Sequence, residues 1–506
     1  MNLIDIPQFI KTYIIKREKS FFESDMKKHH LTLSDKIQGK SVLVIGGAGT
    51  IGSSFIQEIL QFKPSKLYVV DTNENGLTEL TRDLRSSVDA FFPQDFKTYP
   101  MSFGDRVFRK LFVEEGPFQI VANFAAHKHV RSEKDKYSIE AMLDNNVFKA
   151  KEFLDLMIKY KPEHFFCVST DKAANPVNVM GASKKLMEEV IMSYSSELQI
   201  TTARFANVAF SNGSLLAGYI ERLFKNQPIS CPSDVKRFFV SPEESGQICL
   251  LACMLGKSGD IFFPKLDDAT MTYFKEITED FFKASGRKVI HCKSEGEAKR
   301  SASSLKAGDP YPIYYFKSDT SGEKLYEEFY TDKDQVDLEL YSGMGVIKNA
   351  RKLPRKIIES IIDELKVLMN SSDYDKSSIV ELLKQNIPDF QHIETGVNLD
   401  QKCNRTYMYL IIKRICDFTL AVILLVIISP LLIPITIGLS LTGEGYIWYK
   451  QERIGLKNKP FQIWKFATML KNSPNMAGGI MTTKKDPRIT PMGGFLRKTK
   501  INEIPQ

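Results

Sequence analysis

The sequence predicts an α/β protein with a doubly wound parallel sheet, a smaller α+β part and a C-terminal segment inserted in a membrane. Three observations predict this arrangement. Short apolar runs rich in β-branched residues alternate with helical patterns from residue 41 onward, a glycine-rich turn follows the first run, and residues 418–441 carry no charge. Strands separated by helices form a parallel sheet that is covered on both faces.

The alternation sets the order of the expected elements. The strand patterns occupy 41–47, 66–71, 96–103, 118–126, 164–170 and 200–208. Helical patterns occupy 51–61, 75–86, 272–284 and 354–370. We therefore expect four parts: a helical segment at 1–39, the main sheet domain at 40–265, a smaller part with C-terminal helices at 266–404, and a membrane-associated module at 405–506.

Charge is unevenly distributed along the chain. The formal net charge is +8, yet residues 405–506 contain 15 Lys+Arg and 5 Asp+Glu, whereas residues 1–404 contain 54 and 56. A near-neutral N-terminal part argues against a nucleic-acid-binding surface.

The seven cysteines form no CxxC pair and no Cys/His metal spacing, and the N-terminus has no uninterrupted apolar run. We therefore expect no metal, no signal peptide and a reducing cytoplasm.

A glycine-rich turn follows the first strand pattern. Gly46, Gly49 and Gly52 lie in GGAGTIG, and Thr50 and Ile51 begin the helical pattern. Glycines allow a tight turn and a close approach of a pyrophosphate, which the N-terminus of a helix attracts. Asp71 ends the second strand, where a carboxylate accepts hydrogen bonds from ribose hydroxyls and disfavours a 2′-phosphate. We therefore predict a dinucleotide site that prefers NAD to NADP. The alternative is a plain βα turn beside a surface aspartate.

The spacing GxxGxxG resembles the extended short-chain dehydrogenase/reductase superfamily, whose fold is Rossmann-type. The resemblance implies that Asp105, after the third strand, contacts the adenine of the cofactor. It also implies that Ala125, in the segment NFAA, lines the cofactor. Asp105 is equally suited to cap the helical pattern that begins at Arg106.

Three polar residues follow the fifth strand pattern, in VSTDKAANPVNVMGASKK. Thr170, Asp171 and Lys172 therefore lie where ligands bind in open α/β sheets. The superfamily motif YxxxK reads here as Met180 followed by Lys184 at helical spacing. Methionine cannot ionise, so proton transfer by a tyrosine at this position is excluded. Either the protein is inactive or the proton transfer has moved to the three polar residues.

This segment resembles the UDP-N-acetylglucosamine 4,6-dehydratase group of polysaccharide biosynthesis. Further motifs that carry the resemblance are ARFANV, SNGS, RFFVSPEE, SGEKLYEEFY and HKHV. It implies an internal redox cycle in which NAD accepts hydride from sugar C4 and returns it to C6. Lys172 is then the base at C5, and Asp171 is the acid for the C6 hydroxyl. Thr170 holds the C4 hydroxyl, and the group that takes its proton is left open. The alternative is a surface ion pair of Asp171 and Lys172.

The same resemblance places Asn207, Arg237 and Lys324 beside the nucleotide sugar. Arg237 offers a charged fork to a diphosphate. His127 and His129 project to opposite faces if the segment is extended, so a shared metal is not expected.

Residues 418–441 are long enough to cross a bilayer as a helix. Pro430 and Pro434 interrupt the run, so we expect a helical hairpin whose ends both lie at the cytoplasmic face of the bacterial inner membrane. The alternative is a buried helix of a soluble domain. Residues 409–469 resemble bacterial sugar transferases that use undecaprenyl phosphate. That family's Asp-Glu dyad reads Asn502-Glu503 here, and the chain ends at Gln506, so we expect an incomplete module.

The sequence therefore predicts a membrane-associated, NAD-dependent nucleotide-sugar 4,6-dehydratase that forms a homo-oligomer. A C4 epimerase is the first alternative, and a non-catalytic nucleotide-binding scaffold is the second. The exact sugar nucleotide and the stereochemistry at C5 are left open.

Overall fold

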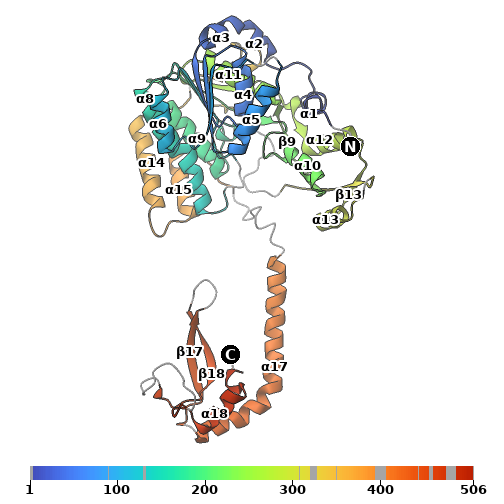
Figure 1. Ribbon diagram of the computed structural model, residues 1–506, viewed down its shortest axis with the longest axis vertical. Coiled ribbons are helices and arrows are strands. Elements are labelled where there is room, and N and C mark those ends of the chain that lie inside the picture. The colour runs from blue at the N-terminus through green and yellow to red at the C-terminus, as the bar shows by residue number, and fades with distance from the viewer. Residues whose placement is uncertain are drawn as a thin grey trace. The chain divides into compact units, whose positions relative to one another are not determined.

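The computed structural model describes residues 4–88, 91–128, 133–306, 308–318, 328–348, 350–393, 406–442, 444–454, 460–473 and 486–504. The chain divides into two compact units, Met1–Gln401 and Lys402–Gln506. Figure 1 shows the sheet and its helices in the first unit, and one long helix with a strand pair in the second.

A nine-stranded sheet forms the centre of the first unit, in the order β15-β16-β11-β6-β5-β4-β1-β2-β3. Its parallel part has the doubly wound order, which reverses between β1 and β4. Antiparallel β16 and β15 extend one edge. The bounds are β1 Ser41–Ile45, β2 Lys66–Asp71, β3 Asp95–Pro100, β4 Ile120–Asn123, β5 His164–Val168, β6 Ile200–Ala203, β11 Ile261–Pro264, β15 Val336–Asp337 and β16 Met344–Ile347.

Helices cover both faces of this sheet because its strands are apolar on both sides. One face packs against α6 (Arg106–Glu114), α7 (Lys136–Leu143), α8 (Lys149–Lys159), α9 (Val179–Met192), α14 (Arg355–Met369) and α15 (Lys376–Asn386). The other packs against α3 (His30–Ile37), α4 (Thr50–Leu60), α5 (Glu74–Ser86) and α11 (Pro242–Leu255), with α2 (Glu23–Lys28) beside them. The predicted Rossmann-type fold is confirmed.

A smaller lobe packs around its own apolar core. It contains the parallel sheet of β13 (Val289–Cys292), β14 (Tyr311–Phe316) and β8 (Ile229–Pro232), with α10 (Leu215–Phe224), α12 (Phe274–Ala284) and α13 (Glu295–Ser303). The N-terminal α1 (Ile6–Phe9) and the π-helical turn η1 (Ile10–Ile14) pack on this lobe. Strand β16 belongs to the nine-stranded sheet, and α14 and α15 pack on it. Residues on both sides of the expected boundary at 265 therefore belong to the lobe built around this sheet, which we call the first lobe.

The second unit is built around α17 (Thr406–Thr442), with a strand pair, β17 (Trp448–Ile454) and β18 (Pro460–Phe466), and α18 (Pro491–Lys498). A small core joins Ile435 and Leu439 of α17 to Phe466 and Leu496. Among the described residues, Ile412–Thr442 is the helix whose length and mean hydropathy of 2.9 suit a membrane span.

The predicted interruption at Pro430 and Pro434 does not divide the helix, because α17 is continuous through both prolines. Pro430 lacks the N–H that would bond to the Val426 carbonyl. The Ser429 hydroxyl donates to that carbonyl at 2.8 Å instead. The side chain therefore satisfies the acceptor that the proline leaves free, and the helix bends without ending (Figure 1).

Candidate functional site

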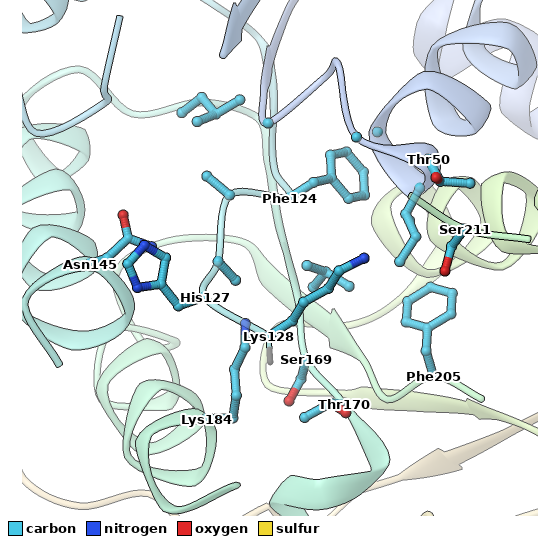
Figure 2. A pocket seen from close by; sticks show the side chains of 18 of the residues that line it. Thr50, Phe124, His127, Lys128, Asn145, Ser169, Thr170, Lys184, Phe205 and Ser211 are labelled. Carbon is cyan, nitrogen blue, oxygen red and sulfur yellow. The ribbon is translucent and has the colours of Figure 1, made fainter. Parts of the chain in front are cut away.

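A cavity of about 580 Å³ lies at the carboxyl ends of the central strands (Figure 2). Its walls come from the segments after β1, β2, β4 and β5 and from the first turns of α9. Strand order reverses between β1 and β4, and crevices at such points bind ligands in open α/β sheets. Of the predicted site residues, Gly46, Gly49, Thr50, Ile51, Gly52, Asp71, Ala125, Thr170, Asp171, Lys172, Lys184 and Asn207 line this cavity.

The glycine turn brings backbone against backbone at the floor of the cavity. Gly46 has a φ of +76°, and a Cβ there would lie 2.5 Å from the Ala125 nitrogen. A Cβ on Gly52 would lie 2.4 Å from the Gly46 carbonyl oxygen. Both positions therefore require glycine. Helix α4 begins at Thr50, so its first N–H groups lie at the cavity wall and offer donors to an anion.

The two aspartates predicted to contact the cofactor occupy different environments. Asp71 lines the cavity, and its carboxylate accepts from Ala48 N at 3.0 Å and from Asn73 N at 2.9 Å. These bonds fix the carboxylate at the end of β2 and leave lone pairs for further donors. Asp105 lies outside the cavity lining and precedes α6, yet its carboxylate accepts from Ser102 N at 2.9 Å and does not cap the helix.

The three polar residues after β5 form a connected hydrogen-bond group. The Thr170 hydroxyl donates to Asp171 Oδ1 at 2.6 Å. Lys172 Nζ donates to both carboxylate oxygens of Asp171 at 3.2 Å. The Asp171 side chain is 4% exposed, while Lys172 is 28% exposed. Asp171 therefore lies between a hydroxyl that lines the cavity and an ammonium that reaches water.

Lys184 lies one helical turn after Met180 on α9, and both line the cavity. Figure 2 shows Lys184 pointing toward the segment that carries His127 and Lys128. Lys184 is almost fully buried, and its polar contact among the described residues is the Met187 sulfur at 3.8 Å. Burial lowers the pKa of Lys184 to about 8, although the negative charge of Glu188 acts in the opposite direction.

A buried ion pair lies next to the turn that carries Thr170, Asp171 and Lys172. Arg204 donates to both carboxylate oxygens of Glu188, at 3.0 and 2.8 Å, and to the Phe329 carbonyl at 2.7 Å. Glu188 also accepts from the hydroxyl of Ser169, the residue before Thr170, at 2.5 Å. Removing one partner of such a pair costs about 3–5 kcal/mol, so the pair fixes the end of β5.

His127 and Lys128 were not among the residues predicted to form the site. Both line the cavity, and Lys128 Nζ donates to the Asn212 carbonyl at 3.2 Å. Asn212 N in turn donates to the Thr50 hydroxyl at 2.9 Å. Burial lowers the pKa of Lys128 and of His127, and the charges of Lys149 and Lys184 add to the effect at His127. Their signal was present in HKHV, polar residues just beyond the fourth strand.

The predicted substrate residues are not all brought together. Asn207, in β7 (Asn207–Val208), lines the cavity. Arg237, in β9 (Lys236–Arg237), is buried outside the lining, and its guanidinium donates to the Lys236 carbonyl at 2.9 Å. Lys324 lies outside the described residues. Within the described ranges, no group of three or more His, Cys, Asp or Glu side chains is placed to hold a metal ion.

The second unit has its own buried polar pair. Arg488 donates to both carboxylate oxygens of Asp486, at 2.9 and 2.6 Å. Asn502 and Glu503 lie in a short 3-10 turn, where Glu503 pairs with Lys465 at 3.5 Å. The side-chain oxygen of Asn502 is buried and accepts no hydrogen bond from the described part of the chain. The position predicted for a nucleophile therefore holds a neutral amide.

Family models match both units. Residues 42–349 match the model described as polysaccharide biosynthesis protein, and residues 408–506 match the model described as bacterial sugar transferase. In the second unit, the chain is 38% identical over 96 residues to the UDP-glucose:undecaprenyl-phosphate glucose-1-phosphate transferase of Escherichia coli, covering 19% of this chain and 20% of that protein.

Relatives of the first unit have different activities. An uncharacterised membrane protein of Methanocaldococcus jannaschii is 29% identical, covering 66% of this chain and 99% of its own length. The UDP-N-acetylglucosamine 4,6-dehydratase (inverting) of Campylobacter jejuni is 26% identical, covering 46% and 69%. The UDP-glucose 4-epimerase of Rickettsia canadensis is 27% identical, covering 48% and 71%. The chain spans about half the length of two further curated relatives, 47% and 49%.

The first unit also resembles solved structures. Pen from Bacillus thuringiensis aligns with a TM-score of 0.50 and 22% identity, covering 65% of this chain and 98% of that one. At this identity the likeness shows the fold alone.

Proposed function

Since the chain belongs to the polysaccharide biosynthesis protein family of extended short-chain dehydrogenase/reductases, we propose that it is a nucleotide-sugar 4,6-dehydratase. Its substrate in this proposal is UDP-N-acetylglucosamine or a close relative, and its cofactor is NAD in preference to NADP. The dehydratase relative supports the choice of substrate. The arrangement of Thr170, Asp171 and Lys172 is the observation that carries the proposal.

The cavity residues fit a nicotinamide dinucleotide. The pyrophosphate would lie against the glycine turn and the N-terminus of α4, where Lys128 supplies a positive charge. Asp71 would accept from the adenosine ribose, and Lys184 would donate to the nicotinamide ribose. When bound, the cofactor supplies reversible oxidation of the sugar at C4 and reduction at C6. A ribose hydroxyl would also give the buried Lys184 ammonium the oxygen partner that it lacks among the described residues.

The Thr170–Asp171 hydrogen bond supplies a route for the C4 hydroxyl proton. Thr170 Oγ1 accepts that proton while its own proton passes to Asp171 Oδ1, 2.6 Å away. Asp171 then holds a proton inside the cavity. The same group can donate that proton to the departing C6 hydroxyl, which leaves as water. The proton taken at C4 therefore leaves in the water lost at C6, and a tyrosine at position 180 is not needed.

Lys172 completes the cycle at C5. Once C4 is a ketone, the C5–H bond is acidic, and the neutral Lys172 amine takes its proton as the C6 hydroxyl departs. Lys172 returns this proton to C5 when C6 is reduced, so both side chains regain their starting states. The cycle begins with an ionised Asp171 carboxylate and a neutral Lys172 amine. This state holds one proton fewer than the ion pair that the two side chains form in the structure.

The C4 epimerase is the second candidate, supported by the epimerase relative. An epimerase also oxidises C4, but it breaks no bond at C5 or C6. It therefore has no use for an acid beside a base at the position of Asp171 and Lys172. This difference makes the dehydratase the better account of the cavity.

For the second unit we propose membrane association at the cytoplasmic face, without sugar transfer. The apolar helix Ile412–Thr442 and the membrane-protein relative support the location. Asn502 cannot act as a carboxylate nucleophile, which supports the absence of transfer.

The proposal is tested by the mass of the sugar nucleotide after incubation with the detergent-solubilised full chain and NAD. A dehydratase yields a product lighter by one water. Unchanged mass with altered chromatographic mobility means an epimerase, and an unaltered substrate means a scaffold. The Asp171→Asn variant is the matched control, since it keeps the shape of the carboxylate but cannot carry the proton.

A further inference from the structure

A carboxylate outside the cavity is bound to the first turn of α9, the helix that carries Lys184. Glu133 Oε2 accepts from the Val179 amide at 2.7 Å, and the Glu133 side chain is 6% exposed. Val179 is the first residue of α9, whose free amides favour a negative charge. Glu133 therefore holds this end of the helix by a charge-assisted hydrogen bond.

Glu133 is in turn held by the C-terminal strap, which we define as residues 387–393. His392 Nε2 lies 2.5 Å from Glu133 Oε1, and Ile387 and Phe390 anchor the strap in the core of the first lobe. The strap also pairs with the loop before α9. Gln391 N donates to the Pro176 carbonyl at 3.1 Å, and Ile393 N donates to the Val177 carbonyl at 2.9 Å.

The loop held by the strap connects the two parts of the proposed catalytic group. Asp171 and Lys172 precede it, and Lys184 follows it on α9. Helix α9 contacts the backbone of the turn that carries Asp171 and Lys172, which we call the catalytic turn of the proposed reaction. A Cβ on Gly181 of α9 would lie 2.7 Å from the Lys172 carbonyl oxygen. A shift in the first turn of α9 therefore moves Lys172.

We propose that Glu133 and His392 are positioning residues for the proposed reaction, which set the distance between the Asp171–Lys172 turn and Lys184. Neither residue lines the cavity, so both act through the loop 174–179. The strap is the last described segment before residues 394–405, which lead to α17. In this proposal, the turn that carries Asp171 and Lys172 is thus held by the last described segment of the first unit.

The test compares three variants of the detergent-solubilised full chain. His392→Ala removes the bond to Glu133, and His392→Gln keeps an N–H donor. Asp389→Asn is the control, because Asp389 lies in the same strap but forms a surface ion pair with Lys333, outside the strap. His392→Ala should lower kcat by about 10–10²-fold, the effect of a small misplacement of reacting groups. KM for UDP-N-acetylglucosamine should stay unchanged, His392→Gln should regain most of kcat, and Asp389→Asn should retain all of it.

Hydrogen–deuterium exchange provides a readout that does not depend on turnover. Peptides that cover 170–184 should exchange faster in His392→Ala than in the unaltered protein or in Asp389→Asn. Unchanged exchange there, or a kcat equal to that of the unaltered protein, overturns the proposal. If His392→Ala does not fold, Glu133→Gln, which preserves volume, must show the same faster exchange. If the unaltered protein converts no sugar nucleotide, the dehydratase proposal fails, and the exchange comparison still decides the role of the strap.

Discussion

Met180 determines which side chains can move protons in the cavity. It fills space beside Lys184 and has no ionisable proton. Of the proton-carrying groups at the wall, Thr170, Asp171 and Lys172 are joined to one another, and their hydrogen bonds run from the cavity to a buried carboxylate and then to a partly exposed amine. In the proposed reaction, the Asp171 carboxylate therefore both accepts the C4 proton and protonates the leaving C6 hydroxyl.

The proposed transfer of the C4 hydroxyl proton through Thr170 to Asp171 is tested by Thr170→Val. This substitution keeps the shape of the side chain and removes its hydroxyl. We expect kcat to fall by about 10²–10⁴, the range for a positioned proton-transfer group. Thr170→Ser retains the hydroxyl and should keep most of the activity, and Met180→Leu should be tolerated. Steady-state kinetics of water loss provide the measurement. Full turnover by Thr170→Val would show that the proton takes another route.

In our proposal, the preference for NAD over NADP depends on Asp71. Its carboxylate, held by two backbone amides, would repel the 2′-phosphate of NADP. We expect the unaltered protein to bind NAD more tightly than NADP, and Asp71→Ala to narrow the difference. Titration of both cofactors by intrinsic fluorescence measures the two affinities. Equal affinities in the unaltered protein contradict the role given to Asp71.

At the scale of single residues, the sequence predicted those cavity-lining residues that directly follow a strand. Thr170 to Lys172 and the glycine turn were predicted because each lies beside one strand. The pair Glu188–Arg204 joins two elements and depends on tertiary packing, so its residues gave no local signal. The exclusion of Arg237 from the cavity lining has the same cause, since β9 pairs with β12 (Thr272–Tyr273), a strand more than thirty residues along the chain.

At the scale of elements, α4 and α11 pack closely on one face of the sheet. A Cβ on Gly246 would lie 2.5 Å from the Ser54 carbonyl oxygen. Glu58 of α4 is buried at this interface, and burial together with the charge of Glu243 raises its pKa to about 7. The folded protein therefore keeps Glu58 protonated in a pH range where the unfolded chain ionises it.

Glu58 is expected to make folding stability depend on pH. Between about pH 4.5 and 7 the folded state binds the extra proton, so stability falls as the pH rises through this window. Glu58→Gln removes the titration and should raise the melting temperature at pH 8, with the gain shrinking toward pH 4.5. Calorimetry across this range provides the measurement, and Glu79→Gln, at an exposed site of α5, is the control. An equal effect of Glu58→Gln at both pH values contradicts this assignment.

The apolar runs in the sequence predicted where the strands lie, but they did not predict the residues at which the strands end. The run 200–208 separates into β6 and β7, because Arg204 turns inward to pair with Glu188. At α17 the helix bends without ending, since the Ser429 hydroxyl satisfies the carbonyl that Pro430 leaves free. Such local compensation depends on a side-chain rotamer that sequence patterns do not reveal.

At the scale of the whole molecule, the chain joins a near-neutral unit to a basic one that bears an apolar helix. Most apolar side chains described in the first half of that helix are exposed, including Phe418 and Val426. An apolar surface of this extent is typical of a segment that contacts lipid. The expected homo-oligomer and the location at the cytoplasmic face stay predictions.

We expect the full chain to sediment with membranes, whereas a chain ending at Asn404 should be soluble. The physical reason is the loss of the exposed apolar surface of α17 together with the basic residues that follow it. Fractionation with a wash at high salt separates insertion from electrostatic adsorption. Stable solubility of the full chain without detergent would contradict the membrane proposal.

The central claim is that the cavity performs an internal redox cycle with loss of water, and one isotope experiment tests it most directly. UDP-N-acetylglucosamine carrying deuterium at C4 is incubated with the detergent-solubilised full chain and NAD, and the product is analysed by NMR. We predict that the deuterium moves to C6 of a sugar that has lost water. Deuterium that remains at C4 of a sugar with its C6 hydroxyl intact would contradict the account.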